Sequence, residues 1–158
     1  MVKEDKQTLD SLDRHYEILK AGFFELLTYC RGRGFRFVIV SNGLGFYIRT
    51  ILETLGIGNI EVFAAQARFG PNGIETSYLG PEGNELKDDF KETYIRNFLR
   101  NGYRVICVGN GASDIPSAKL ADYVFATGPL LVHCKGAKLN CTPFTDLNDI
   151  VRGLELLV

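Results

Sequence analysis

The sequence has no tryptophan, one methionine and two histidines among its 158 residues. No apolar run approaches the roughly 20 residues that a membrane-spanning helix needs, and the opening stretch MVKEDKQTLD has no signal-peptide core. A net charge of −1 provides no broad basic field for nucleic acid. We therefore expect no nucleic-acid partner and no membrane partner, and we predict a cytoplasmic protein.

The sequence also has no C-x-x-C pair among its four cysteines. Cys30 and Cys107 lie in apolar surroundings, which is typical of small core residues. His133, Cys134 and Cys141 match the spacing of no common zinc finger, and a fourth ligand is not evident. We therefore predict no zinc site.

What the sequence does contain is an alternation of short apolar runs and helical patterns, in a chain whose length fits one domain. Strands are predicted over 35–40, 60–65, 104–108 and 123–126, and a β-hairpin over 66–80 around Pro71-Asn72-Gly73. Helices are predicted over 8–31, 47–55, 90–99, 115–120 and 146–157, with a short one near Leu130 and Asp146 as the last helix's N-cap. This alternation predicts an α/β fold, with a parallel sheet covered by helices on both faces.

Polar, glycine-flanked residues follow two of the predicted strands. Ser41-Asn42-Gly43 follows the first and Asn110 follows the third, so both belong to the carboxyl edge of the sheet, where ligands collect. A hydroxyl and successive backbone N–H groups suit a phosphate. A helix N-cap requires the same residue types, so the two interpretations of Ser41 are equally supported.

Two charged residues open predicted helices. Lys91 lies where the helix dipole disfavours a cation, so it is either directed at an anion or solvated in a charged surface turn, which is the commoner case. Asp114 is either another N-cap or a ligand for a hard cation such as Mg²⁺.

A dinucleotide site is disfavoured by spacing. Gly109-Asn110-Gly111-Ala112-Ser113-Asp114 places an acid where G-x-G-x-x-G has its third glycine. Asp122 also follows too closely to be the acid that binds the ribose. A nucleotide-binding module is therefore the weakest of the alternatives.

The order of these signals is more informative than each alone. A strand ending in serine, a helix-opening lysine and a strand-GxGxxD-helix unit resemble the haloacid dehalogenase (HAD) superfamily of phosphatases, in its phosphoserine-phosphatase-like branch. The stretches VIVSNGLGFYIRTIL, FAAQARFGPNG, FKETYIRNFL and VGNGASDIPSAKLADYVFA are most similar to the subgroup around 2-hydroxy-3-keto-5-methylthiopentenyl-1-phosphate phosphatase. The resemblance implies a Rossmann-like HAD core in a single domain over 1–158, with 1–34 as a remnant cap or linker helix and 35–158 as the core.

The resemblance also implies roles for individual residues. Ser41, with the backbone of Asn42 and Gly43, matches the position that holds the phosphoryl group. Lys91 matches the catalytic lysine that offsets the charge of the phosphate. Asp114 matches an acid that helps to hold Mg²⁺.

Two departures from the family pattern affect the expected activity. The family's Asp-x-Asp nucleophile motif is missing, since Asp10-Ser11-Leu12-Asp13 has the wrong spacing and a helical pattern. We expect about fifty to seventy residues of a typical family member to be absent, judged from usual domain sizes. Asn110 stands at the other Mg²⁺ position, where the family has an acid, and its amide brings no charge.

The expected function follows from the resemblance and its departures. We expect a Mg²⁺-dependent phosphatase of a small phosphorylated metabolite that is truncated, and inactive or incomplete as this chain alone. The alternative is a non-catalytic protein that binds a phosphorylated ligand or a protein partner.

The missing motif also removes a strand. In the superfamily that strand lies in the centre of the sheet, between those ending at Ser41 and Gly109. We therefore expect either direct pairing of Val38 with Ile106, or a gap filled by a second chain or by a homodimer.

Overall fold

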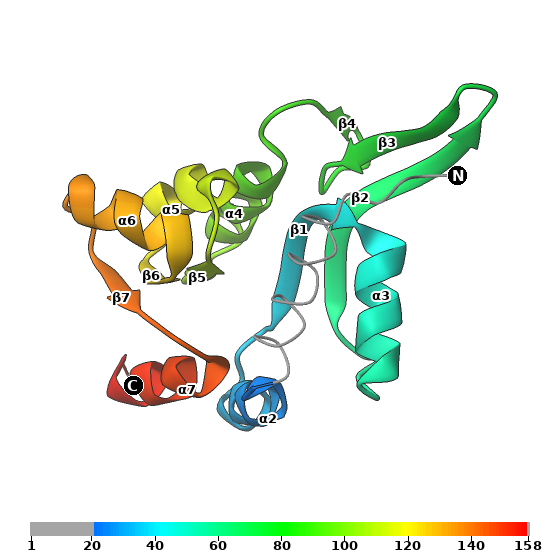
Figure 1. Ribbon diagram of the computed structural model, residues 1–158. Helices are drawn as coiled ribbons and strands as arrows, with labels where there is room; N and C mark the ends of the chain where they lie inside the picture. The colour runs from blue at the N-terminus through cyan, green and yellow to red at the C-terminus, as the bar shows by residue number, and fades with distance from the viewer. Residues whose placement is uncertain (1–20, 158) are drawn as a thin grey trace. The chain divides into compact units, whose positions relative to one another are not determined.

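Figure 1 shows the computed structural model, which describes residues 21–157. The chain divides into two compact units, one comprising Met1–Arg36 and Phe144–Val158 and the other Phe37–Pro143. The assignment of 1–34 to a remnant cap or linker helix and of 35–158 to the core stays a prediction. No helix in the described range is long and apolar enough to cross a membrane.

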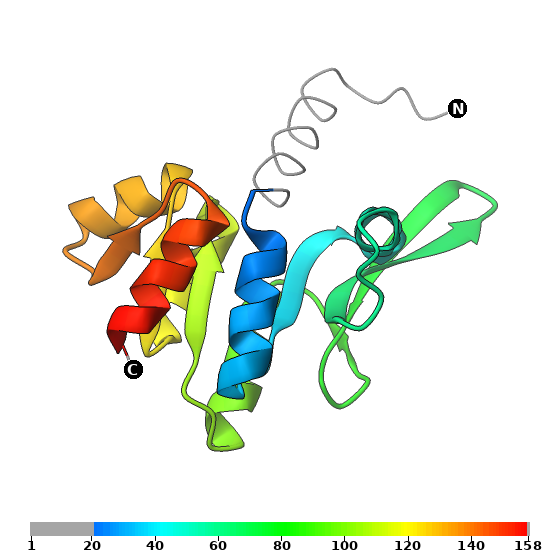
Figure 2. The same ribbon diagram turned by 90° about the horizontal axis from the view of Figure 1, so that it is seen from below.

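The described residues of the first unit form two helices that pack on each other, α2 (Phe23–Arg33) and α7 (Leu147–Leu157) (Figure 2). Asp146 begins α7 as predicted, because its carboxylate accepts the Asn148 N–H at 2.8 Å. The earlier part of the helix predicted over 8–31 lies outside the described residues. The two helices bury apolar side chains that recur at three- and four-residue spacing: Phe23, Leu26, Leu27, Cys30, Leu147, Ile150 and Leu154.

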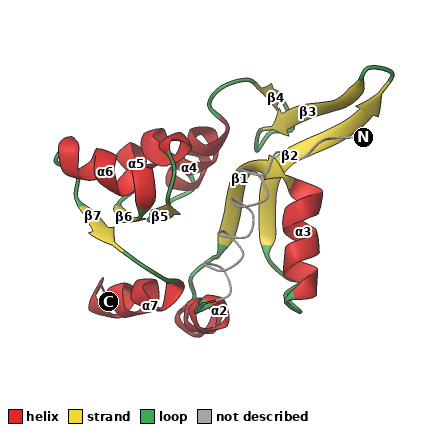
Figure 3. Cartoon of the chain, viewed as in Figure 1, coloured by secondary structure: helices red, strands yellow, loops and turns green. Residues whose placement is uncertain are grey.

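The second unit contains two sheets, and the first has the order β1-β2-β3-β4 (Figure 3). Strand β1 (Val38–Leu44) pairs in parallel with β2 (Glu61–Gly70), and α3 (Gly45–Thr54) connects them. Strand β3 (Gly73–Leu79) then returns antiparallel to β2 and pairs with the short β4 (Glu85–Leu86). The predicted hairpin is confirmed, with Gly70 opposite Gly73.

The second sheet is wholly parallel, in the order β5-β6-β7. Its strands are β5 (Ile106–Gly109), β6 (Tyr123–Ala126) and β7 (Cys141–Pro143), connected through α5 (Ile115–Leu120) and α6 (Gly128–Gly136). A disulfide between Cys134 and Cys141 joins α6 to β7. The sheet's core consists of Cys107, Ala118, Val124, Ala126, Leu130 and Cys134.

The parallel α/β architecture is confirmed, and of the two alternatives for β1 and β5, direct pairing is not found. Val38 pairs with Glu61 and Ile106 with Tyr123, in separate sheets. Helix α4 (Phe90–Arg100) contacts both β1 and α5, so side-chain packing joins the two halves of this unit where backbone pairing does not.

Candidate functional site

The loop that leaves β5 is organised around the carboxylate of Asp114. Its Oδ2 atom accepts the backbone N–H groups of Asn110 and Gly111, each at 3.1 Å. Asp114 is the N-cap residue of α5, as one of the two interpretations held, but its carboxylate turns back to the loop and makes no side-chain capping bond to that helix. The loop N–H groups thus satisfy a buried acid within four residues of chain.

Gly109 makes this close approach feasible. A Cβ atom at this position would lie 2.7 Å from Asp114 Oδ2, well inside van der Waals contact. The last residue of β5 therefore has to be glycine for the carboxylate to rest against the end of the strand.

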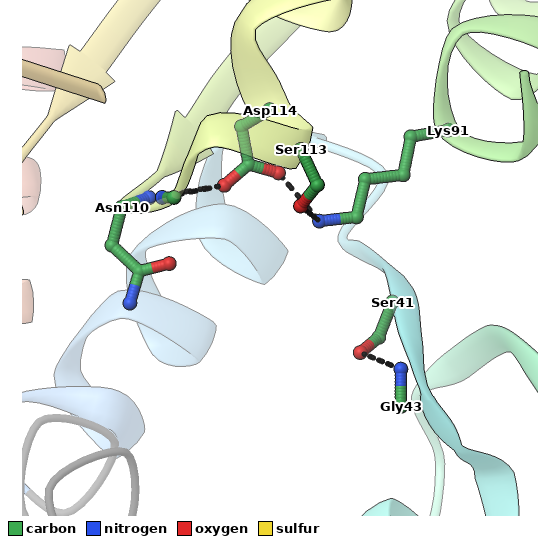
Figure 4. Close-up of polar contacts among 7 residues, drawn as sticks. Ser41, Gly43, Lys91, Asn110, Ser113 and Asp114 are labelled. Carbon is green, nitrogen blue, oxygen red and sulfur yellow. Dashed lines mark hydrogen bonds and ion pairs between the residues drawn. The ribbon is translucent and has the colours of Figure 1, made fainter. Parts of the chain in front are cut away.

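The other oxygen of Asp114 binds Lys91. The Lys91 Nζ atom lies 2.6 Å from Asp114 Oδ1 and 3.1 Å from Ser113 Oγ (Figure 4). The Lys91 and Asp114 side chains are only 17% and 12% exposed, so the interpretation of Lys91 as a solvated surface lysine is wrong. Asp114 and the Ser113 hydroxyl offset the unfavourable interaction between the Lys91 ammonium and the dipole of α4, whose first turn carries this residue.

Ser113 was missed by sequence reasoning. Its only signal was a hydroxyl directly before the acid of the GxGxxD unit, and hydroxyls are common in such turns for purely local reasons. The contact with Lys91 spans 22 residues and depends on how α4 packs.

Helix α4 is positioned by the face that it buries. Phe90, Tyr94 and Ile95 are buried on it, and the Tyr94 ring stacks on Phe63 of β2 with centroids 4.5 Å apart. Lys91 follows Phe90 directly, so the packing that fixes Phe90 also fixes the start of the lysine side chain.

The irregular end of β1, Ser41–Gly43, is called the β1 loop, and it is less strongly supported than the loop after β5. The β1–β2 ladder is interrupted between Val40 and Leu44, and Ser41 Oγ accepts the Gly43 N–H at 3.1 Å. Helix α3 has Leu44 as its N-cap residue, so the N-cap interpretation of Ser41 is wrong. The hydroxyl instead helps to shape the loop before the helix.

A residue from the hairpin also reaches this loop. The Tyr78 hydroxyl donates a hydrogen bond to the Asn42 carbonyl oxygen at 3.0 Å, across 36 positions of sequence. No sequence pattern indicated this contact, because it depends on how the hairpin folds over the end of β1.

The predicted site residues are thus only partly brought together. Lys91 and Asp114 are in direct contact, and Asn110 reaches Asp114 through its backbone. Ser41 and Gly43 form a second small cluster at the end of β1 (Figure 4). Within residues 21–157, Ser41 makes no hydrogen bond to Lys91 or Asp114, so a ligand bound by both clusters would have to link them.

The electrostatics of the site argue against a cysteine nucleophile. Burial, and secondarily the negative charge of Asp114, raises the pKa of Cys107 to about 12. The thiol therefore stays protonated near neutral pH, and no thiolate is available in β5, just before the Asp114 loop.

The donor set does not fit a strong Mg²⁺ site by itself. Both Asp114 oxygens already accept hydrogen bonds, one of them from an ammonium group at 2.6 Å. Figure 4 shows the Asn110 side-chain amide extending away from that carboxylate. The described residues contain no group of three His, Cys, Asp or Glu side chains suited to a metal, whereas Mg²⁺ usually relies on one or two carboxylates plus a substrate phosphate.

Comparison with known proteins defines the family. A sequence model for haloacid dehalogenase-like hydrolases matches residues 4–119. The chain belongs to this family. The resemblance inferred from the Ser41, Lys91 and Asp114 motifs is therefore confirmed at the level of the family.

Curated relatives share the subgroup indicated by the sequence. The chain is 27% identical over 140 residues to 2-hydroxy-3-keto-5-methylthiopentenyl-1-phosphate phosphatase of Bacillus velezensis, covering 87% of this chain and 59% of that protein. The Geobacillus kaustophilus phosphatase of the same name is 30% identical over 141 residues, with 87% and 63% covered. The chain thus spans about three-fifths of the length of these relatives.

Solved structures support the same branch. A phosphoserine phosphatase in its apo form superposes with a TM-score of 0.56 and 25% sequence identity, covering 81% of this chain and 63% of that structure. A phospho-aspartyl intermediate analogue of phosphoserine phosphatase gives the same score and identity, and 60% of that structure is covered.

Proposed function

We propose that this HAD-like chain binds the phosphate group of a small phosphomonoester at the ends of β1 and β5. The Ser41 hydroxyl and the Asn42–Gly43 backbone would hold the phosphoryl oxygens, and Lys91 would neutralise their charge. The observation that carries the proposal is Lys91 itself, a mostly buried ammonium held by Asp114 and Ser113 at the loop after β5. Asp114 is its anionic partner in the structure, and a bound phosphate would share this ammonium with that carboxylate.

We also propose that hydrolysis by this chain alone is very slow. Enzymes accelerate phosphate-monoester hydrolysis by up to ~10²¹, so every component of the catalytic machinery contributes. The sequence has no Asp-x-Asp nucleophile motif, and the Mg²⁺ site around Asp114 and Asn110 is weak or incomplete. Lys91 could then stabilise charge in the transition state without a nucleophile to complete the reaction.

Two measurements separate binding from turnover. Calorimetry with inorganic phosphate should show binding to the unmodified chain and a large loss in Lys91→Met, while Lys119→Met, at an exposed lysine of α5, should bind normally. A phosphate-release assay with Mg²⁺ and a panel of phosphomonoesters, including 2-hydroxy-3-keto-5-methylthiopentenyl-1-phosphate, should give turnover far below ~1 s⁻¹. Turnover above that rate would overturn the proposed inactivity, and absence of phosphate binding would overturn the site.

The second candidate is a non-catalytic protein that binds a phosphorylated ligand or a protein partner. It is favoured by the tight Lys91–Asp114 pair, which occupies the acid that a metal would need. Phosphate binding that is unchanged by chelators would favour this alternative, whereas binding that strengthens with Mg²⁺ would favour the phosphatase.

We further propose that a second chain, or a second copy of this one, completes the sheet. Strands β1 and β5 each have one edge without a strand partner among the described residues, and open edges readily accept another strand. Sedimentation analysis should then show a dimer or a complex, and a strict monomer at all concentrations would count against the homodimer. A cytoplasmic location stays a prediction from the sequence.

A further inference from the structure

Tyr78 touches both sides of the proposed phosphate site. Its hydroxyl donates to the Asn42 carbonyl oxygen at 3.0 Å, and its ring packs on Phe90 with centroids 5.1 Å apart. Phe90 directly precedes Lys91. One side chain of β3 therefore contacts the β1 loop and the first turn of the helix that carries the lysine.

The loop has little other support. Ser41 to Gly43 have no ladder partner on β2, since the register is interrupted between Val40 and Leu44. The bond from the Gly43 N–H to Ser41 Oγ is internal to the loop. Within the described part of the chain, the Tyr78 hydroxyl is thus the side-chain donor that holds this loop from outside.

The hydrogen bond from Tyr78 to Asn42 acts on the peptide unit whose N–H is proposed to bind the anion. The Asn42 carbonyl and the Gly43 N–H belong to one planar peptide unit, so fixing the direction of the oxygen also fixes the direction of the N–H. We infer that Tyr78 is a positioning residue that orients the Gly43 N–H, which donates to Ser41 Oγ in the structure, toward the phosphate group that the Ser41 hydroxyl would bind. This inference rests on the proposed function, because it names how that site is held ready for its ligand.

Packing alone does not account for this residue. The contact with Phe90 requires an aromatic ring but not a hydroxyl, so Tyr78→Phe keeps the ring and removes only the bond to the loop. Tyr94 offers a matched control, because its hydroxyl donates to the Leu79 carbonyl oxygen at 2.8 Å and its ring lies 5.2 Å from Phe90. Tyr94→Phe thus removes a similar bond in the same aromatic cluster without touching the Asn42 peptide.

The test compares the two variants by calorimetric titration with inorganic phosphate. Loss of one hydrogen bond predicts about three- to tenfold weaker phosphate binding in Tyr78→Phe and little change in Tyr94→Phe. Both variants should lower Tm by a similar few degrees, since each loses one hydroxyl bond. A difference in phosphate affinity at equal Tm is the signature of a positioning role.

Amide hydrogen exchange gives a readout that needs no ligand. The Gly43 amide should exchange faster in Tyr78→Phe than in the unmodified chain, and Tyr94→Phe should leave it unchanged. Equal loss of affinity in both variants, or unchanged Gly43 exchange and phosphate affinity in Tyr78→Phe, would overturn the inference. If the unmodified chain binds no phosphate, the proposed function fails, and Gly43 exchange alone then decides whether Tyr78 orients this peptide.

Discussion

The two strand-end loops of Phe37–Pro143 are held together differently. The loop after β5 leaves its parallel strand before a helix, whereas the β1 loop interrupts the pairing at the end of its strand, directly before α3. Each carries residues predicted to meet a phosphate or a metal. The loop after β5 closes on its own acid, Asp114, which accepts two backbone N–H groups and pairs with Lys91. The β1 loop has a single internal hydroxyl contact and depends on Tyr78, which lies 36 positions from Asn42.

This difference shows two ways of preparing a loop for a ligand. A carboxylate within the loop makes strong, charge-assisted bonds over a few residues and needs little help from the rest of the fold. A loop with only a hydroxyl relies on neighbouring elements, so it is easier to displace and to reshape. We expect substitutions to reveal this inequality, beginning with the largest effect.

Replacement of Asp114 by alanine should have the largest effect on stability. It leaves Lys91 without its carboxylate and two loop N–H groups without an acceptor, so we expect a loss of about 2–4 kcal/mol in unfolding free energy. Ser41→Ala, in the weaker loop, should cost less than about 0.5 kcal/mol. Urea denaturation measures both, and equal losses would contradict the proposed difference between the loops.

Reduction of the Cys134–Cys141 disulfide should have the second-largest effect on stability. Helix α6 supports the Asp114 loop, because the Leu130 N–H donates to the Asn110 carbonyl oxygen at 3.2 Å. Opening this short loop should cost about 2 kcal/mol. Urea denaturation with and without dithiothreitol measures the loss, and the Cys134→Ser/Cys141→Ser double variant should not respond to the reductant. If dithiothreitol also lowered the stability of that variant, the loss would not come from this disulfide.

Replacement of Lys91 by methionine should lower the unfolding free energy only a little but should strongly weaken phosphate binding. Asp114 keeps its two loop N–H donors, so we expect a loss of about 1 kcal/mol in unfolding free energy, together with the loss of phosphate binding. The exposed Lys119→Met variant should change neither quantity. If Lys91→Met destabilised the chain as much as Asp114→Ala, the lysine and not the acid would be the organising charge.

Of the substitutions around Asp114, replacement of Asn110 by aspartate should change stability least and Mg²⁺ binding most. A second carboxylate in the loop supplies the charge that Mg²⁺ prefers, while repulsion from Asp114 should cost about 0.5–1 kcal/mol without the ion. Calorimetry should show at least tenfold tighter Mg²⁺ binding than in the unmodified chain. Asn101→Asp, at another Asn-Gly pair that is exposed, is the control and should gain nothing.

The local features of this fold could be predicted from short stretches of sequence. The Asn72-Gly73 pair indicated the hairpin, Asp146 indicated the start of α7, and the alternation of strands and helices indicated parallel pairing. Each depends on backbone preferences within a few residues. Short β7 was not predicted, because its three residues include a proline and its pairing comes entirely from β6.

The sequence by itself indicated which residues are proposed to contact a phosphate, through the order of Ser41, Lys91 and Asp114 along the chain. Only the tertiary structure decided that Lys91 is mostly buried against Asp114 and Ser113, that Tyr78 bonds to Asn42, and that β1 and β5 lie in separate sheets. The physical reason is the distance along the chain between the residues in contact. Turns and caps follow from neighbouring residues, whereas these contacts link distant segments and exist only after the helices and the hairpin have packed.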